Sequence, residues 1–239
     1  MRRIPWVPVF FLALGMQGAW AEPKATDVSG IKVGVPLAAQ RDAIAKINPN
    51  YQLNDIKLAN GKLLGVLATA RKDGTLVDHF LAVQDDDGTV WYVERGQEYA
   101  KGERIRKDVL LNSLKDKYGQ EYTDVRWDYA PQWEYDRHNN LYKGIRGPCA
   151  DLENSYIGRI EGFNVSVPTS FTESCGLKIE TSMSFDSEDA DMVSRFVISI
   201  TDPKHQYDVL SSRAAKEEAD EKARKQRLLE SEKANKPKL

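Results

Sequence analysis

The chain has 239 residues, of which 41% are hydrophobic, and it carries 34 Lys and Arg against 36 Asp and Glu, a net charge of −2. This length and composition allow one large domain or two small ones. They exclude the strongly basic surface that is typical of nucleic-acid-binding domains, so we expect no nucleic-acid partner.

The first 21 residues have the features of a secretory signal peptide. Arg2 and Arg3 precede an apolar run, Val7 to Met16, and Ala19-Trp20-Ala21 is a small-x-small sequence of the kind that signal peptidase cleaves. The alternative is an uncleaved membrane anchor, but the run is roughly half of the ~20 residues that a membrane-spanning helix needs. We therefore expect residues 1–21 to be removed, the mature protein to be periplasmic or secreted, and no stable membrane insertion.

A flexible lead is expected at residues 22–29, followed by a first structural unit at residues 30–101. Pro36 suits the first position of a helix, and the apolar stripe that follows it ends at Asn48-Pro49. The hydrophobic period then changes to the period of two that is typical of β-strands. Turn residues, with Asp85-Asp86-Asp87-Gly88 as the clearest hairpin turn, separate strands predicted at 52–58, 63–71, 78–84 and 89–95.

A second unit is predicted at residues 102–203. The stretch from Gly147 to Cys175 is interpreted as an extended insertion within it. Because each sheet must bury one face, the helix of each unit is expected to pack across that face. The fold class is therefore predicted as α+β, with two tandem helix-plus-antiparallel-meander units that indicate an internal duplication. The second unit has a helix at 103–118, with Gly119 as its C-cap, and strands at 122–130, 140–145, 177–185 and 193–201.

Residues 204–239 are predicted as a long charged helical tail with a disordered end at 233–239. From Arg213 onward the tail holds 9 Lys and Arg against 6 Asp and Glu. We expect it to dock by its first turns and then to run into solvent or into a coiled coil, and contact with an anionic membrane surface or a partner helix is the alternative. Acid-before-base pairs four residues apart stabilise such a helix by roughly 0.2–0.5 kcal/mol each. The pairs are Glu218–Lys222, Asp220–Arg224 and Glu221–Lys225.

Cys149 and Cys175 are the two cysteines of the chain, 26 positions apart. In an oxidising compartment they are expected to form one disulfide. Closing a loop of that size stabilises the folded state by about 3–4 kcal/mol. A redox or nucleophilic cysteine is the alternative, but the pair lacks the Cys-x-x-Cys spacing of redox sites.

The densest aromatic cluster of the chain is a candidate partner-binding surface. Aromatic rings on one face of a sheet can seat a partner's side chains or stack on sugar rings, and packing in the core is the alternative. The cluster comprises Trp127, Tyr129, Trp133, Tyr135 and Tyr142.

Three polar side chains alternate within the same region. Glu134, Asp136 and His138 share one face of an extended backbone, where they offer oxygen and imidazole ligands to a divalent metal. A polar loop explains these residues with fewer assumptions, so we expect no metal and no cofactor. A hydrolase or carbohydrate-active protein that uses Glu134 and Asp136 beside the aromatic cluster is a further hypothesis.

The segment Gly30–Asn48, a Gly-x-x-x-Gly sequence that leads into a helix and a small antiparallel meander, resembles the repeat unit of the beta-lactamase inhibitor protein fold. The module also resembles the small lipoprotein of the outer-membrane assembly machine, but no cysteine directly follows the apolar run of the leader to carry a lipid. Val90-Trp91-Tyr92-Val93 and Lys117-Tyr118-Gly119 are similar to sequences in exported proteobacterial proteins. The resemblance implies a binding or scaffolding role without catalytic residues. We therefore expect a non-enzymatic interaction module with an envelope or secreted protein partner, and a periplasmic inhibitor or immunity protein is the alternative.

Overall fold

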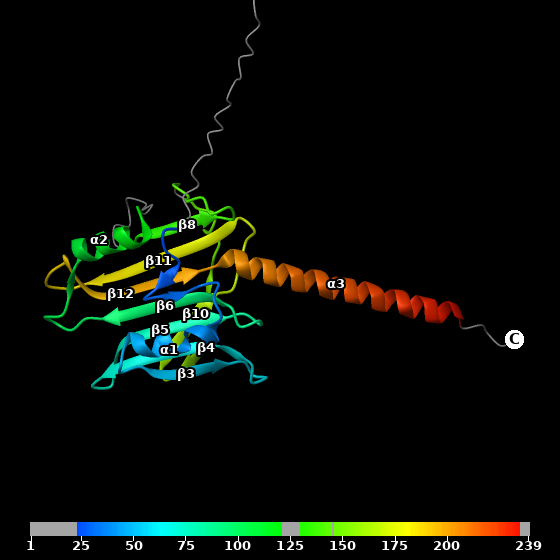
Figure 1. The fold of residues 1–239 in the computed structure, drawn as a ribbon, viewed down its shortest axis with the longest axis horizontal. Helices are drawn as coiled ribbons and strands as arrows, with labels where there is room; N and C mark the ends of the chain where they lie inside the picture. The colour runs from blue at the N-terminus through cyan, green and yellow to red at the C-terminus, as the bar shows by residue number, and fades with distance from the viewer. Residues whose placement is uncertain (1–22, 121–129, 145, 235–239) are drawn as a thin grey trace, which may run out of the picture.

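The computed structural model describes residues 23–120, 130–144 and 146–234, which form an α+β body and a long projecting helix (Figure 1). The helices are α1 (Leu37–Ile47), α2 (Lys107–Tyr118) and α3 (Pro203–Ala234). The short strands are β1 (Asp27–Val28), β2 (Ile31–Lys32) and β7 (Ile105–Arg106). The longer strands are β3 (Gln52–Lys57), β4 (Leu63–Lys72), β5 (Thr75–Gln84), β6 (Val90–Glu98), β8 (Gln132–Asp136), β9 (Asn154–Ile160), β10 (Phe163–Pro168), β11 (Cys175–Phe185) and β12 (Met192–Thr201).

A single antiparallel sheet organises the described part of the chain. Its strands lie in the order β3-β4-β5-β6-β12-β11-β8, and β7 pairs with the end of β12. The strands β3 to β6 follow one another as a meander, whereas β12, the last strand of the chain, pairs with β6. The strands predicted for two units therefore belong to one continuous sheet.

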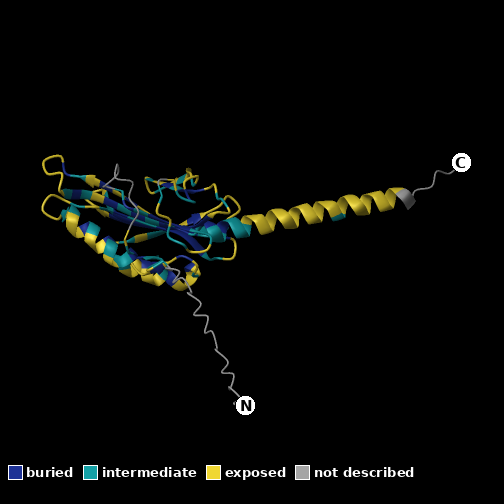
Figure 2. Ribbon diagram, turned by 90° about the horizontal axis from the view of Figure 1, so that it is seen from above, coloured by how far each residue is buried: buried dark blue, intermediate teal, exposed yellow. Residues whose placement is uncertain are grey.

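One face of this sheet is covered by α1, α2 and the hairpin of β1 and β2. Leu37 and Ile44 of α1 and Leu110 and Leu114 of α2 enter the main core there, and Figure 2 shows that burial is concentrated in the sheet. Val28 belongs to the same core and is only 2% exposed. The lead predicted as flexible at 22–29 therefore ends before β1, because pairing and burial hold that strand.

The hairpin of β9 and β10 covers half of the opposite face, over β4, β5 and β6. Among the described residues, the other half, on β12 and β11, alternates as a solvated antiparallel sheet does: Met183 is buried, whereas Ser182 and Ser184 are exposed. We refer to this outer surface as the open half of the sheet. Its side chains are Lys178, Glu180, Ser182, Ser184, Arg195, Val197 and Ser199.

The predicted strands agree with the observed ones where side chains alternate regularly. The four strands of the first unit and the last two of the second are confirmed to within three residues at each end. The strand predicted at 140–145 is wrong, because Asp136 closes a tight turn and Leu141 makes only an isolated bridge to Tyr135. The strand predicted at 122–130 lies almost entirely outside the described residues. Segments interpreted as loop and insertion instead form β8 and the β9–β10 hairpin.

The C-terminal helix α3 begins at a well-formed cap and then leaves the body. Asp202 accepts a hydrogen bond from the His205 backbone N–H (2.9 Å), and Pro203 takes the first helical position. The 32 residues of α3 span about 48 Å. Beyond Val209 nearly every residue of α3 is exposed, so the helix projects into solvent as the sequence predicts (Figures 1 and 2).

Charged side chains cover the projecting part of α3 and form ion pairs along it. Two of the predicted pairs form, Glu218 with Lys222 (2.6 Å) and Glu221 with Lys225 (2.7 Å). Within the described ranges, no helix combines the length and the apolar character that crossing a membrane requires. The predicted disordered end at 233–239 falls largely outside the described residues.

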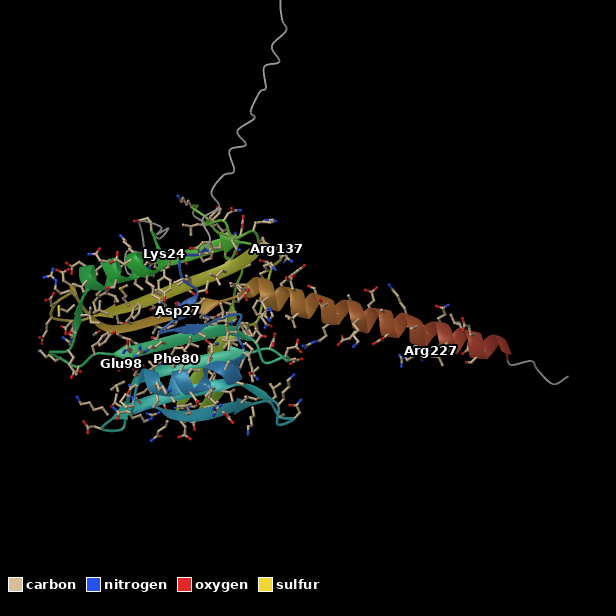
Figure 3. The ribbon with its side chains drawn as sticks, in the orientation of Figure 1. Lys24, Asp27, Phe80, Glu98, Arg137 and Arg227 are labelled. Carbon is tan, nitrogen blue, oxygen red and sulfur yellow. A yellow bond between two sulfur atoms is a disulfide. The ribbon has the colours of Figure 1, made fainter. Side chains whose placement is uncertain are left out.

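The first turns of α3 are anchored to the body by ion pairs. The His205 imidazole contacts the Asp85 carboxylate at 2.6 Å, and Arg213 pairs with Asp86 in the same hairpin turn. On the other side, Arg137 contacts Asp208 at 2.6 Å, and Figure 3 shows Arg137 beside the base of α3. Asp85 also closes the turn predicted from sequence, since its Oδ1 accepts from the backbone N–H groups of residues 87 and 89.

Replacing Asp85 with asparagine is expected to lower the free energy of unfolding by about 1.5–3 kcal/mol at neutral pH, because a buried carboxylate with charge-assisted hydrogen bonds is lost. Burial raises the pKa of Asp85, but the hydrogen bonds from His205 and the turn outweigh it and hold that pKa below its usual value. The stabilisation is therefore present above the unfolded-state pKa of about 3.9 and is lost as the pH falls through the lowered folded-state pKa.

Urea denaturation of wild type and Asp85→Asn at neutral and acidic pH measures this effect. The difference between the two proteins should shrink below about pH 4. Asp86→Asn in the same turn is the matched control, since its half-exposed side chain should contribute less than about 1 kcal/mol. A difference that stayed constant down to low pH would contradict the assignment.

Candidate functional site

The predicted aromatic surface does not assemble as one patch. Trp133 and Tyr135 are 0% and 3% exposed and belong to the main core, where neither can reach a partner. Tyr142 lies at the surface with 38% exposure. Trp127 and Tyr129 lie outside the described residues. The core interpretation therefore applies to Trp133 and Tyr135.

The three polar residues considered for a metal have separate roles. Glu134 accepts a hydrogen bond from the Cys149 backbone N–H at 3.0 Å. Asp136 accepts from the backbone N–H groups of His138 (2.8 Å) and Asn140 (2.9 Å) and so closes the turn after β8. Burial raises the pKa of Asp136, but these hydrogen bonds and that of the Asn140 side chain lower it overall. Within the described ranges, no three His, Cys, Asp or Glu side chains gather as a metal site.

Cys149 and Cys175 form the predicted disulfide, with their Cα atoms 4.8 Å apart. The bond joins the turn at 147–150 to the first residue of β11. A side chain on Gly147 would collide with the Glu134 carboxylate and would have to displace it. The disulfide therefore fixes the chain just before the β9–β10 hairpin begins.

A groove of about 540 Å³ runs between the β9–β10 hairpin and the open half of the sheet. We refer to it as the hairpin groove. Phe163 and Asn164 at the start of β10 form one wall, and Val197 lies on the sheet. The polar and charged side chains of its floor and rim are Arg71, His79, Glu94, Ser182, Ser184 and Arg195.

A hydrogen-bonded row of three side chains lies at the floor of the hairpin groove, where His79 and Glu94 line the groove and the buried Tyr92 does not. The His79 Nε2 atom lies 3.0 Å from Glu94 Oε1, and the Tyr92 hydroxyl donates to Glu94 Oε2 at 2.6 Å. Because Glu94 is the acceptor, we assign the hydrogen of His79 to Nε2. Burial, reinforced by Glu94, raises the pKa of Tyr92 well above its usual range, so its hydroxyl stays protonated. Each oxygen of Glu94 thus takes part in one hydrogen bond.

The position of His79 depends on the residues above and below it. Its ring lies over the backbone of Gly96, where any side chain would collide with it. Phe163 of the hairpin packs on the imidazole with ring centroids 4.4 Å apart. The side chain of His79 is therefore almost wholly buried, and it joins the sheet to the hairpin.

Two arginines lie at the rim of the hairpin groove. Arg71 donates to the backbone carbonyls of Gly74 (3.1 Å) and Glu161, groups that hold the guanidinium without neutralising its charge. Arg195 is half exposed and reaches Glu98 only at 4.0 Å. Among the described residues that line the groove, two arginines face one carboxylate, so the lining has a net positive charge and favours an anionic group on its ligand.

Sequence reasoning did not find this groove. None of His79, Glu94 and Arg195 was predicted as a site residue. One local signal was present: Tyr92, Glu94 and Gly96 alternate on the face of β6 opposite the buried Val93. A polar face that contains a glycine indicates a close approach from another chain segment.

Comparison of the chain with protein-family models, curated proteins and solved structures found no match.

Proposed function

We propose that this protein is an exported, non-enzymatic interaction module of the bacterial envelope that binds an acidic segment of another envelope or secreted protein in the hairpin groove. The observation that carries the proposal is the pair of arginines, Arg71 and Arg195, at the rim of a groove that continues onto the open half of the sheet. The signal-like leader and the Cys149–Cys175 disulfide support export, because disulfides persist in oxidising compartments.

Charge complementarity favours an acidic partner segment. Residues 22–212 hold 23 Lys and Arg against 30 Asp and Glu, so the body as a whole repels anions. Arginines at the groove rim are therefore a local exception, and a guanidinium can bind a carboxylate through two parallel hydrogen bonds. Such an arrangement selects the orientation of a partner more than it adds to the total affinity.

The surface beside the groove supports a polypeptide ligand. A specific protein interface covers about 800 Å² on each partner, more than a groove of this size presents. The open half of the sheet continues beyond the groove, and two of its exposed hydroxyls, Ser182 and Ser184, also line the groove. These groups offer donors and acceptors to the backbone and side chains of a bound segment.

Replacing Arg195 with glutamate is expected to weaken partner binding at least about tenfold, because an attractive charge at the rim becomes a repulsive one. A photo-crosslinking residue at position 184, the cross-strand neighbour of Arg195, captures the partner in cells. The affinity of the purified pair is then measured for wild type, Arg195→Glu and Arg195→Lys. Arg195→Lys retains the charge and should retain most of the binding.

A probe at Asp42, on an exposed part of α1 across the sheet, is the control for nonspecific capture. Equal capture of the partner from positions 42 and 184 would contradict the proposed site. The same conclusion follows if Arg195→Glu binds the captured protein as tightly as wild type. A partner whose enzymatic activity falls on binding would identify the module as an inhibitor.

A further inference from the structure

A second cavity, of about 220 Å³, opens on the helix-covered face of the sheet between β1 and α2. It lies across the sheet from the hairpin groove and shares no residue with it. Its walls are apolar side chains from three different elements, each at most 8% exposed. They are Val28, Leu114, Tyr118, Phe196 and Ile198.

Two side chains of α2 hold β1 beside the cavity. The Tyr118 hydroxyl donates to the Asp27 carbonyl at 2.8 Å, and the Lys117 ammonium contacts the Asp27 carboxylate at 2.7 Å. Figure 3 shows Asp27 over the middle of the sheet. Protein interiors are normally packed without voids larger than a water molecule, so an open apolar cavity of this size is available to a ligand.

The rim of the cavity carries two cations whose counter-ions lie outside it. Arg95 donates through Nε and Nη2 to Asp78 (3.2 and 2.8 Å) and through Nη1 to the Ser29 hydroxyl (2.9 Å), and Lys117 donates to Asp27. The described residues that line the cavity include both of these cations and no carboxylate. A guanidinium has five N–H donors and an ammonium three, so each retains donors beyond those used in its ion pair.

We infer that this cavity binds a small amphiphilic carboxylic acid, with its hydrocarbon body against the apolar walls and its carboxylate at Lys117 and Arg95. The apolar walls exclude a ligand that is polar throughout, and the cations at the rim favour an anionic head over a cationic one. The cavity is smaller than the 300–1,000 Å³ typical of sites for drug-sized ligands, which limits the ligand to a short chain or a single ring. This site is independent of the proposed function.

Binding of two probes with the same tail tests the head-group preference. Octanoate and octylammonium are titrated separately into the mature protein at neutral pH and followed by calorimetry and by the NMR signals of Leu114 and Ile198. We expect octanoate to bind saturably and at least about tenfold more tightly than octylammonium. Lys117→Glu should remove that preference, whereas Lys115→Glu, on the same helix but outside the cavity lining, should keep it.

A second variant distinguishes a loss of binding from a folding defect. This is needed because Lys117 also pairs with Asp27, and its substitution could disturb the fold. Gln97→Glu places a negative charge at another point of the rim and leaves that ion pair intact. It too should weaken octanoate binding at least about tenfold. Equal binding of the two probes, no saturable binding of octanoate, or octanoate binding unchanged in both rim variants would overturn the inference.

Discussion

Replacing Trp133 with alanine is expected to lower the free energy of unfolding by about 3–5 kcal/mol, the range for a large aromatic side chain removed from a core. Trp133 is 0% exposed, and its ring packs on Tyr118 with centroids 5.5 Å apart. Its indole N–H donates to the Gly119 carbonyl at 3.0 Å, so the substitution also leaves the C-terminal end of α2 without that donor. Loss of the ring contact and of the hydrogen bond weakens the packing of α2 against β8.

Urea denaturation followed by circular dichroism measures this loss. Tyr142→Ala is the matched control, because this side chain belongs to the same predicted aromatic cluster but lies at the surface. Its substitution should change the free energy of unfolding by about 0.5 kcal/mol or less. If Trp133→Ala proved as stable as Tyr142→Ala, the assignment of Trp133 to the core would be wrong.

Removing the disulfide is expected to lower the free energy of unfolding by about 3–4 kcal/mol, because the unfolded chain gains the freedom of an open loop. The Cys149→Ala/Cys175→Ala protein is the test. The bond encloses the β9–β10 hairpin, so its loss should also loosen the wall of the hairpin groove. Binding of the proposed partner should therefore weaken along with stability.

Reduction of the wild-type protein provides the control for this experiment. Reduced wild type and the double alanine protein should unfold at similar urea concentrations, and a reductant should have no effect on the double alanine protein. A double alanine protein as stable as oxidised wild type would show that the crosslink contributes nothing. A reductant effect that persisted without the two cysteines would point to another cause.

Local patterns were enough to predict most of the secondary structure. The alternation of Ser182, Met183 and Ser184 indicates a half-buried strand, and Asp85 to Gly88 indicates the hairpin turn that the structure contains. The pairing of β6 with β12 has no such local signal, because it joins segments about a hundred residues apart. The β9–β10 hairpin was not predicted, although Glu161-Gly162 lies at its turn, because the stretch between the two cysteines was interpreted as an extended insertion.

The candidate sites were harder to predict than the strands because they depend on register. His79 and Gly96 become neighbours only when β5 and β6 pair in one particular alignment, and a shift by one residue would turn His79 to the other face. The same limit applies to the region of the aromatic cluster. Trp133 and Glu134 are adjacent in sequence, but their side chains lie on opposite faces of β8. Composition alone does not distinguish the buried side from the exposed one.

The seam between β6 and β12 sets the order in which this chain can complete its fold. Glu94 pairs with Ser199, so the backbone edge of β6 stays unsatisfied until nearly the whole chain is present. Sheets closed by such distant partners fold in milliseconds to seconds, and their uncovered edges are sites of aggregation meanwhile. Under the proposed export, the chain would cross a membrane with its N-terminus first and would carry an open strand edge throughout the passage. A chaperone that shields β6 during that interval would protect it.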